Sequence, residues 1–184
     1  SGGSAANTVA GVASLGGKAG FVGKVRDDQL GEVFAHDIRA AGVAFEAGPS
    51  ADGLPTGRSL ILVTPDAQRT MNTYLGIAAA ISPGDVDPAF VARGEVCYVE
   101  GFLWDAPTAK AAVARAMDAA KAAGRQVAFS LSDGFCVDRH RAEFRDLIDG
   151  RIDVVFANEV EICSLWEVDS FDAAVDRVRG QDRI

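Results

Sequence analysis

The spacing of apolar residues alternates between short runs typical of buried strands and longer stretches with helical periodicity. Helices are predicted over residues 5–15, 28–41, 106–123, 138–148, 160–166 and 171–178. Strands are predicted over residues 20–25, 96–100, 127–131 and 153–157. Strands that alternate with helices favour parallel pairing, because each helix returns the chain to the same end of the sheet. The pattern therefore predicts an α/β fold with a parallel sheet flanked by helices on both faces.

Residues 43–75 depart from this alternation. Short β-rich pieces at 43–45, 59–63 and 70–74 are separated by turns that contain proline and glycine. They form either a small sheet or one core strand with lid strands beside it. We therefore expect one α/β domain over residues 1–184 with a small β-rich lid insertion around 43–75. The exposed strand edges of such a lid could pair with a second copy, which predicts a homodimer through the lid strands.

Small, polar and acidic residues follow three of the predicted strands. Gly101 and Phe102 follow the strand at 96–100, and Ser132-Asp133-Gly134 follow the strand at 127–131. Asn158, with Glu161 three residues on, follows the strand at 153–157. Ligands of open parallel sheets bind outside the carboxyl ends of the strands. These residues, together with a glycine-led helix that we expect Ser4 to cap, predict a site for an anion and for a cation or a hydroxyl group.

Composition and charge narrow the classes of function. The 184 residues suffice for one main core. The 18 Lys and Arg against 26 Asp and Glu give a net charge of −8, which argues against a nucleic-acid partner. No apolar run approaches the roughly 18 residues of a membrane span, so no membrane partner is expected. The 3 cysteines, without a Cys-x-x-Cys pair, favour free thiols in the cytoplasm over a zinc site.

Two motifs have both a structural and a functional interpretation. Asn158 and Glu161 have the spacing of a helix capping box, and the same two side chains could order the water around Mg²⁺; both roles can hold at once. Arg69, in the β-rich lid, is either a solvated charge or a cation delivered to a transferring phosphoryl group. His140, between two arginines, is interpreted as a surface residue rather than a general base.

The first residues, Ser1-Gly2-Gly3-Ser4, also match a linker introduced by cloning. Asn7 favours a functional interpretation, because one turn inside the predicted helix its amide could bind adjacent hydroxyls of a sugar. Gly2 and Gly3 would let the backbone approach that sugar closely. The run lacks G-x-G-x-x-G, which places a dinucleotide-binding oxidoreductase last among the alternatives.

These motifs resemble the ribokinase-like, or PfkB, family of carbohydrate and nucleoside kinases. GGSAANT followed by LGGKAGFVGKVRDDQLG is similar to the first signature of the family, and ANEVE is similar to its N-x-x-E motif. The stretches LPTGRSLILVTPDAQRTMNTYLG and YVEGFLWDAP resemble the adenosine-kinase branch. The resemblance covers essentially the whole chain.

The resemblance implies a ribokinase-like (Rossmann-like) fold and ATP-dependent transfer of phosphate to a sugar or nucleoside hydroxyl, with Mg²⁺. It implies that Gly2, Gly3 and Asn7 hold sugar hydroxyls and that Phe102 lies against the base or sugar. Arg69 would stabilise phosphate charge when the lid closes. Asn158 and Glu161 would order Mg²⁺ through water.

The family's Gly-Ala-Gly-Asp motif, which would supply the anion hole and the general base, does not occur in the sequence. The first strand of the family is likewise expected before Gly2, so we expect the chain to be an incomplete portion of a kinase. A ribokinase, fructokinase or ketodeoxygluconate kinase is the alternative within the enzyme class. A non-catalytic sugar-binding module is the alternative outside it.

Overall fold

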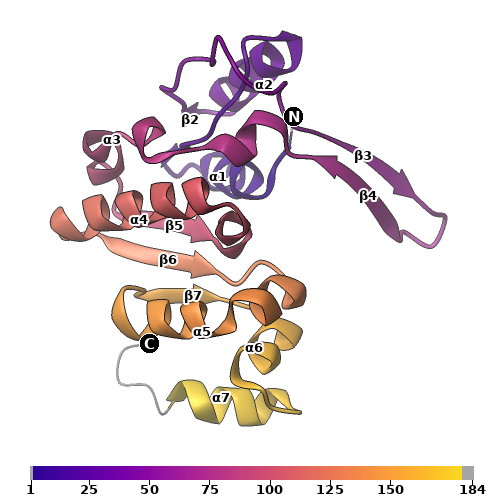
Figure 1. Ribbon diagram of the computed structural model, residues 1–184, viewed down its shortest axis with the longest axis vertical. Helices are drawn as coiled ribbons and strands as arrows, with labels where there is room; N and C mark the ends of the chain where they lie inside the picture. Colours follow the sequence, from indigo (N-terminus) through magenta and orange to yellow (C-terminus); the bar gives the residue numbers. More distant parts are fainter. Residues whose placement is uncertain (1, 180–184) are drawn as a thin grey trace. The chain divides into compact units, whose positions relative to one another are not determined.

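A computed structural model of the protein describes residues 2–179. The chain forms two compact units, Ser1–Asp85 and Val86–Ile184 (Figure 1). The expectation of a single domain over residues 1–184 stays a prediction. No helix among residues 2–179 is long and apolar enough to cross a membrane.

The first unit contains a short parallel strand pair, two helices and an antiparallel hairpin. Its helices and strands are α1 (Ser4–Ser14), β1 (Ala19–Gly20), α2 (Gln29–Ala40), β2 (Val43–Ala44), β3 (Arg58–Val63) and β4 (Arg69–Tyr74), followed by 3₁₀ turns η1 (Gly76–Ala80) and η2 (Pro83–Asp85). Strand β1 pairs in parallel with β2. The strand predicted over 20–25 is wrong in its extent, because beyond Gly20 the chain makes isolated backbone bonds, such as Phe21 N–H to the Ala44 carbonyl at 2.9 Å, rather than a continuous ladder.

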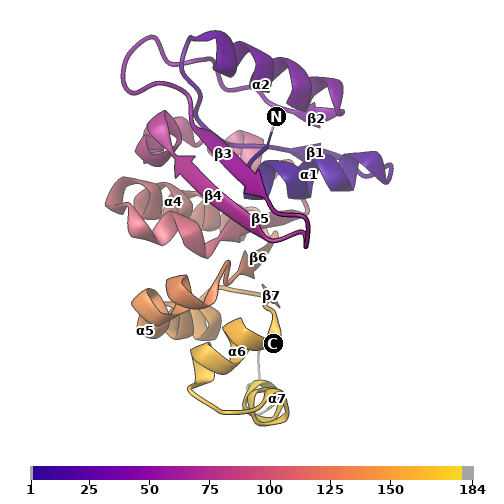
Figure 2. The ribbon, with the colours of Figure 1, turned by 90° about the vertical axis from the view of Figure 1, so that its right-hand side faces the viewer.

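Three phenylalanine rings form the centre of the first unit's core. Phe21, Phe34 and Phe45 have ring centroids 5.7–5.8 Å apart. Ala6 of α1 and Ile38 of α2 are buried in the same cluster. Figure 2 shows α2 beside β2 and α1 beside β1. The core therefore ties the first turns of α1 to the strand pair.

The β-rich stretch of residues 43–75 contains two different structures. Strand β2 belongs to the parallel pair, whereas β3 and β4 form an antiparallel hairpin in which Arg58 lies opposite Tyr74. This arrangement confirms the alternative of one core strand with lid strands beside it. Every residue of β3 and β4 is exposed. We call this hairpin, residues 58–74, the lid hairpin.

The root of the lid hairpin is held by Asp28, which also caps α2. One carboxylate oxygen of Asp28 accepts from the Gly31 N–H at 2.8 Å and the other from the Thr56 N–H at 2.9 Å. These hydrogen bonds, the one from Thr56 first, hold the pKa of Asp28 below its ordinary value. At Gly76, φ is +54° and a Cβ would collide with the Pro55 carbonyl, so glycine is required where the chain leaving the hairpin passes close to the chain entering it.

The second unit is a three-stranded parallel sheet with helical connections. Its elements are α3 (Pro88–Ala92), β5 (Val96–Glu100), the 3₁₀ turn η3 (Gly101–Asp105), α4 (Pro107–Ala122), β6 (Gln126–Ser130), α5 (Gly134–Gly150), β7 (Val154–Phe156), α6 (Glu159–Trp166) and α7 (Phe171–Arg179). The strand order is β5-β6-β7, and both pairings are parallel. The alternation predicted from the sequence is confirmed in this unit.

The core of the second unit surrounds the central strand β6. Val127, Phe129 and Leu131 are completely buried and Ala128 is 3% exposed, so both faces of the strand are covered, as is typical of a parallel sheet. Phe129 stacks edge-on against Phe144 of α5 at 5.0 Å between centroids. Cys136 is also completely buried, and burial raises the pKa of its thiol to about 11.

Helix α5 begins earlier than the prediction of residues 138–148. Asp133 is its N-cap, accepting from the Cys136 N–H at 2.6 Å, so Gly134 is the first helical residue. The helix is kinked at His140, where φ is −122° and ψ is 15°. Asp133 and Asp138 are equally suited to capping by residue type. The helix begins after Asp133 because Cys136 and Val137, in its first turn, are buried in the core.

Candidate functional site

The N-terminal end of α1 is the candidate ligand-binding part of the first unit. Gly3, not Ser4, occupies the N-cap position, so the prediction that Ser4 caps the helix is wrong. Gly3 has φ of +123° and ψ of 142°, a conformation that is essentially restricted to glycine. A Cβ at Gly3 would meet only the Ala6 Cβ, at an ordinary contact distance of 3.6 Å, so backbone conformation rather than crowding requires glycine at position 3.

Asn7 lies one turn inside α1, as the sequence predicts. Its N–H donates to the Gly3 carbonyl at 2.8 Å, and its side chain is exposed. The first turn of α1 has no acidic residue and no side-chain cap bond. This helix end, with Gly2, Gly3 and Asn7 exposed on it, is therefore compatible with a hydroxyl or an anion.

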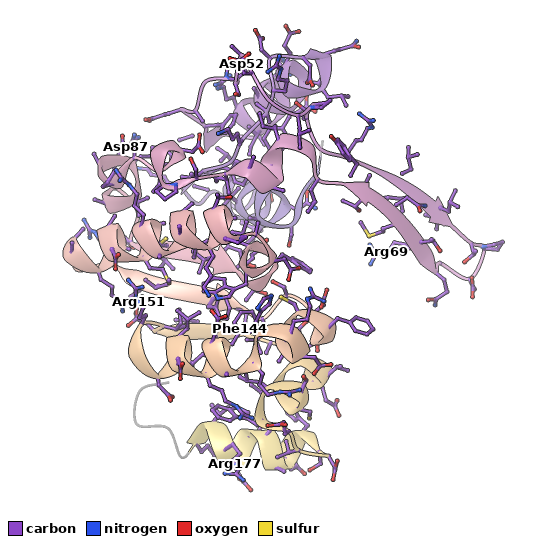
Figure 3. All side chains as sticks on the ribbon, in the orientation of Figure 1. Asp52, Arg69, Asp87, Phe144, Arg151 and Arg177 are labelled. Carbon is purple, nitrogen blue, oxygen red and sulfur yellow. The ribbon has the colours of Figure 1, made fainter. Side chains whose placement is uncertain are left out.

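Arg69 is the first residue of β4 and lies opposite Val63 in the lid hairpin (Figure 3). Its side chain is exposed, and within residues 2–179 its guanidinium has neither an ion-pair nor a hydrogen-bond partner. Figure 3 shows Arg69 on the hairpin. An exposed arginine without a partner among residues 2–179 is solvated here and is available for an anionic ligand, so both interpretations given by the sequence stay open.

The carboxyl ends of β5 and β6 lie side by side in the second unit. Strand β5 ends in Glu100, a buried carboxylate that accepts from the Tyr98 hydroxyl at 3.1 Å. Sequence reasoning did not single out Glu100, although a charged residue at the end of an apolar strand is a signal that could have found it. Phe102 follows with its side chain 44% exposed, and its N–H donates to Ser132 Oγ at 3.2 Å.

The carboxyl end of β7 leads into the predicted capping box of α6. The Asn158 side chain accepts from the Glu161 N–H at 2.9 Å. Glu161 accepts twice in return, at Oε2 from the Asn158 N–H at 3.1 Å and at Oε1 from Asn158 Nδ2 at 2.8 Å. Glu161 is 7% exposed while Asn158 is exposed. The structural interpretation of this motif is thus confirmed, with one hydrogen bond more than a capping box requires.

The residues of this box fit a water-mediated role at Mg²⁺ better than direct ligation. Each Glu161 oxygen already accepts one hydrogen bond and keeps a second lone pair. Residues 2–179 contain no group of three His, Cys, Asp or Glu side chains arranged to hold a metal ion. Mg²⁺ usually keeps several waters and is bound by few protein groups, so one carboxylate oriented by Asn158 is compatible with it.

His140 is partly buried and paired, where the sequence analysis expected a surface residue rather than a general base. Its side chain is 17% exposed, and Nε2 lies 2.7 Å from Asp105 Oδ1. Hydrogen bonds from Arg139 and His140 hold the pKa of Asp105 below its ordinary value. The two partners are distant in the sequence, so no local pattern could have indicated the pair. His140 ties α5 to the turn that carries Phe102.

The parallel strands flanked by helices, with an exposed antiparallel hairpin, form an α/β fold of the ribokinase-like class. A family profile, "pfkB family carbohydrate kinase", matches residues 1–182. The chain therefore belongs to the PfkB family of carbohydrate kinases.

Solved structures of high similarity carry two different descriptions. The chain is 52% identical to the adenosine kinase of Sinorhizobium meliloti, with a TM-score of 0.93, covering 98% of this chain and 55% of that one. It is 50% identical to a probable sugar kinase of Rhizobium etli, with the same TM-score and the same coverage.

A curated relative, the 5-dehydro-2-deoxygluconokinase of Shouchella clausii, is 33% identical over 71% of this chain and 41% of its own length. The fructokinase-1 of Oryza sativa is 29% identical over 93% of this chain and 54% of its own length. The chain thus spans about half the length of the relatives it matches. The ribokinase-like fold predicted from the sequence is confirmed.

Proposed function

We propose that the polypeptide carrying this chain transfers phosphate from ATP to a hydroxyl of a nucleoside, with the 5′-hydroxyl of adenosine as the acceptor. The observation that carries this proposal is the 52% identity to an adenosine kinase over 98% of the chain. The curated relatives that act on sugars or sugar acids are less similar, at 33% identity or below. Two solved structures have this level of similarity, and we base the nucleoside acceptor on the one of higher identity, the adenosine kinase.

In this proposal the N-terminal end of α1 binds the ribose. The exposed Asn7 amide has a donor and an acceptor for two adjacent hydroxyls, and Gly3 keeps the backbone free of a side chain where the sugar approaches. Phe102, with 44% of its side chain exposed, provides an aromatic surface for the base. These roles use side chains that the fold leaves accessible.

Arg69 and the box of Asn158 and Glu161 act on the phosphates. The unpaired Arg69 guanidinium would stabilise charge on the transferring group when the lid hairpin closes. Glu161, oriented by two hydrogen bonds from Asn158, would hold the waters of Mg²⁺. When bound, Mg²⁺ neutralises charge on the phosphate oxygens of ATP.

The alternative acceptor is a sugar such as fructose, ribose or a ketodeoxygluconate. The similarity to a probable sugar kinase at 50% identity favours this second candidate. A non-catalytic sugar-binding module remains the alternative outside the enzyme class. The Gly-Ala-Gly-Asp tetrapeptide separates a kinase from this module, because a module without a general base would bind sugar and leave ATP intact.

The test is an ADP-release assay of the complete polypeptide with ATP and Mg²⁺. Adenosine, ribose, fructose and 2-keto-3-deoxygluconate are supplied separately as acceptors, and the product is identified by mass spectrometry. We expect adenosine 5′-monophosphate and the highest kcat/KM with adenosine. A higher kcat/KM with any of the sugars would reject the nucleoside proposal, and ligand binding without ADP release would favour the non-catalytic module.

We also propose that the lid hairpin pairs with a second copy of the chain. The hairpin carries apolar side chains on both faces, with Leu60 and Leu62 on one and Ile61 and Val63 on the other. All four are at least 49% exposed. A two-stranded sheet with two uncovered apolar faces is marginally stable. Covering one face with the ligand and the other with a partner subunit would therefore stabilise the hairpin.

A further inference from the structure

Phe102 is an exposed aromatic residue on a turn whose backbone is held at both ends. The turn η3 runs from Gly101 to Asp105, and its Trp104 is 5% exposed, whereas Phe102 is 44% exposed. An exposed phenylalanine on a mobile loop would gain little as a binding surface, because ordering it would cost conformational entropy. The contacts that fix η3 therefore bear on what Phe102 can bind.

The first half of η3 is packed directly onto the end of β6. A Cβ at Gly101 would lie 2.8 Å from the Leu131 carbonyl and 2.9 Å from Phe144 Cζ, so the backbone fits there only without a side chain. The Phe102 N–H then donates to Ser132 Oγ at 3.2 Å, and that hydroxyl donates to the Ser130 carbonyl at 3.3 Å. Ser132 thus joins the loops that follow β5 and β6.

The second half of η3 is fixed to α5 by polar contacts. Trp104 Nε1 donates to Glu143 at 3.1 Å. Asp105 accepts from Arg139 at 2.8 and 3.1 Å and is paired with His140 at 2.7 Å. Because both halves of η3 are attached, the backbone of Phe102 has little freedom. Its ring can therefore contact a ligand without a loss of backbone entropy.

Ser132 adopts a backbone conformation that favours glycine. Its φ is +78°, one of three positive values at non-glycine residues among those described. Glycine would adopt this conformation without strain, so a serine here indicates that its side chain is needed. Among the residues that the structure describes, the hydroxyl's one link beyond its own loop is the hydrogen bond from Phe102. The strain and this hydrogen bond are two separate observations that indicate the same role.

We propose that Ser132 is a positioning residue that holds Phe102 in place as a preformed surface for the planar base of a nucleoside. This inference rests on the proposed nucleoside acceptor and deepens it, because it names a residue that discriminates a nucleoside from a free sugar. Ser132 does not contact the base; it acts through the backbone of Phe102.

The test compares Ser132→Ala, Ser132→Gly, Phe102→Ala and the Ser132→Ala/Phe102→Ala pair in the complete polypeptide, with adenosine and ribose binding measured by calorimetry. Loss of one hydrogen bond should raise the Kd for adenosine about three- to tenfold in both Ser132 variants. Ser132→Gly, freed of strain, should melt no lower than Ser132→Ala while binding adenosine equally weakly. The Kd for ribose should not change.

The double variant decides whether Ser132 acts through Phe102. When the ring is absent, Ser132→Ala should change the Kd for adenosine less than twofold, because residues that act as a unit are not additive. Ser14→Ala, which removes an exposed hydroxyl bonded to the Gly11 carbonyl at the far end of α1, is the matched control and should bind like the wild type.

Three outcomes would overturn the proposal: an unchanged adenosine Kd in both Ser132 variants, fully additive effects in the double variant, or an equal loss of ribose binding. If the wild type phosphorylates adenosine and Ser132→Ala binds it normally, the positioning role fails and the proposed function stands. If the wild type binds ribose and not adenosine, both fail. Amide hydrogen exchange gives a readout independent of activity: the Phe102 N–H should exchange faster in Ser132→Ala, and unchanged exchange would also contradict the proposal.

Discussion

At the scale of single residues, Glu161 combines a structural and a proposed chemical role. Both of its oxygens accept a hydrogen bond from Asn158, so Glu161→Gln turns an NH₂ group toward one of those donors. We expect the free energy of unfolding to fall by about 1–2 kcal/mol. If Glu161 also orders the waters of Mg²⁺, the Mg²⁺ concentration for half-maximal turnover will rise in the complete polypeptide.

The control for Glu161→Gln is Glu159→Gln, which removes the same charge from an exposed side chain in the same turn of α6 and leaves the hydrogen bonds between Asn158 and Glu161 in place. Thermal melting and the Mg²⁺ dependence of turnover are measured on the same samples. An unchanged Mg²⁺ curve in Glu161→Gln would leave this residue with its structural role alone.

Asn7 is expected to affect binding and not folding. Its side chain is exposed and lies inside α1, where alanine has the higher helix propensity, so Asn7→Ala should leave the melting temperature unchanged or raise it. Loss of hydrogen bonds to the sugar should weaken adenosine binding by about 1–3 kcal/mol. Calorimetry and thermal melting check the two parts, and a much lower melting temperature with normal binding would contradict them.

Some residue positions were predictable and others were not, for identifiable reasons. The box of Asn158 and Glu161 is local, so its spacing alone indicated the contacts. The pair of Asp105 and His140 joins residues 35 positions apart, and only packing brings them together. The positive φ of Ser132 gives no signal in the sequence, because serine carries no preference for that conformation.

At the scale of elements, helices and strands were predicted in the right order because periodicity and glycine terminators mark them. The errors concern their ends. The N-cap of α1 is Gly3 rather than Ser4, and α5 begins after Asp133 rather than at Asp138. In each case the sequence offers a second residue of suitable type, Ser4 one position and Asp138 five positions beyond the residue that the structure uses.

The lid hairpin is the element on which the proposed dimer depends. Leu62→Lys places a charge on one apolar face, opposite Thr70, in a strand where every side chain is exposed. We expect the mass measured by light scattering to fall from that of a dimer to that of a monomer, with the melting temperature changed by a few degrees at most. Val63→Lys is the matched variant on the face of Arg69, which we expect to reduce turnover and leave the dimer intact.

A wild-type polypeptide that is monomeric at all concentrations tested would reject the proposed dimer. A dimer that persists in Leu62→Lys would place the interface elsewhere on the protein.

The contact between η3 and α5 should be sensitive to acid. The pKa of Asp105 is lowered in the folded protein, chiefly by its hydrogen bonds with Arg139 and His140, so the ionised form stabilises the fold. That contribution is complete above the ordinary value of 3.8 and is lost as the pH falls through the lower folded value.

Asp105→Asn should therefore destabilise the protein at pH 7, and the difference from the wild type should shrink below pH 3.8. Because Asp105 is half exposed, we expect a loss of about 0.2–1 kcal/mol at neutral pH. Urea unfolding of both proteins at several pH values measures this difference. A gap that is constant over the whole range would show that the charge of Asp105 plays no part.

At the scale of the whole molecule, the proposed active site needs residues that these 184 do not include. The general base and anion hole implied by the family resemblance belong to a Gly-Ala-Gly-Asp motif that the 184 residues do not contain. We expect the purified 184-residue chain to release no ADP from ATP above background, since a general base alone contributes about 10²–10⁴-fold. Turnover by this chain at the rate of the complete polypeptide would refute that expectation.

Because Cys136 is buried, the rate at which its thiol is modified can measure how often the core of the second unit opens. A thiol with no exposed surface and a pKa near 11 cannot react with an aromatic disulfide reagent while the fold is closed. Its modification must wait for Phe129, Phe144 and their neighbours to separate. In a variant with Cys97 and Cys163 replaced by alanine, the rate of colour development at the remaining sulfur would therefore report how often the core opens, without a substrate or an assay of activity.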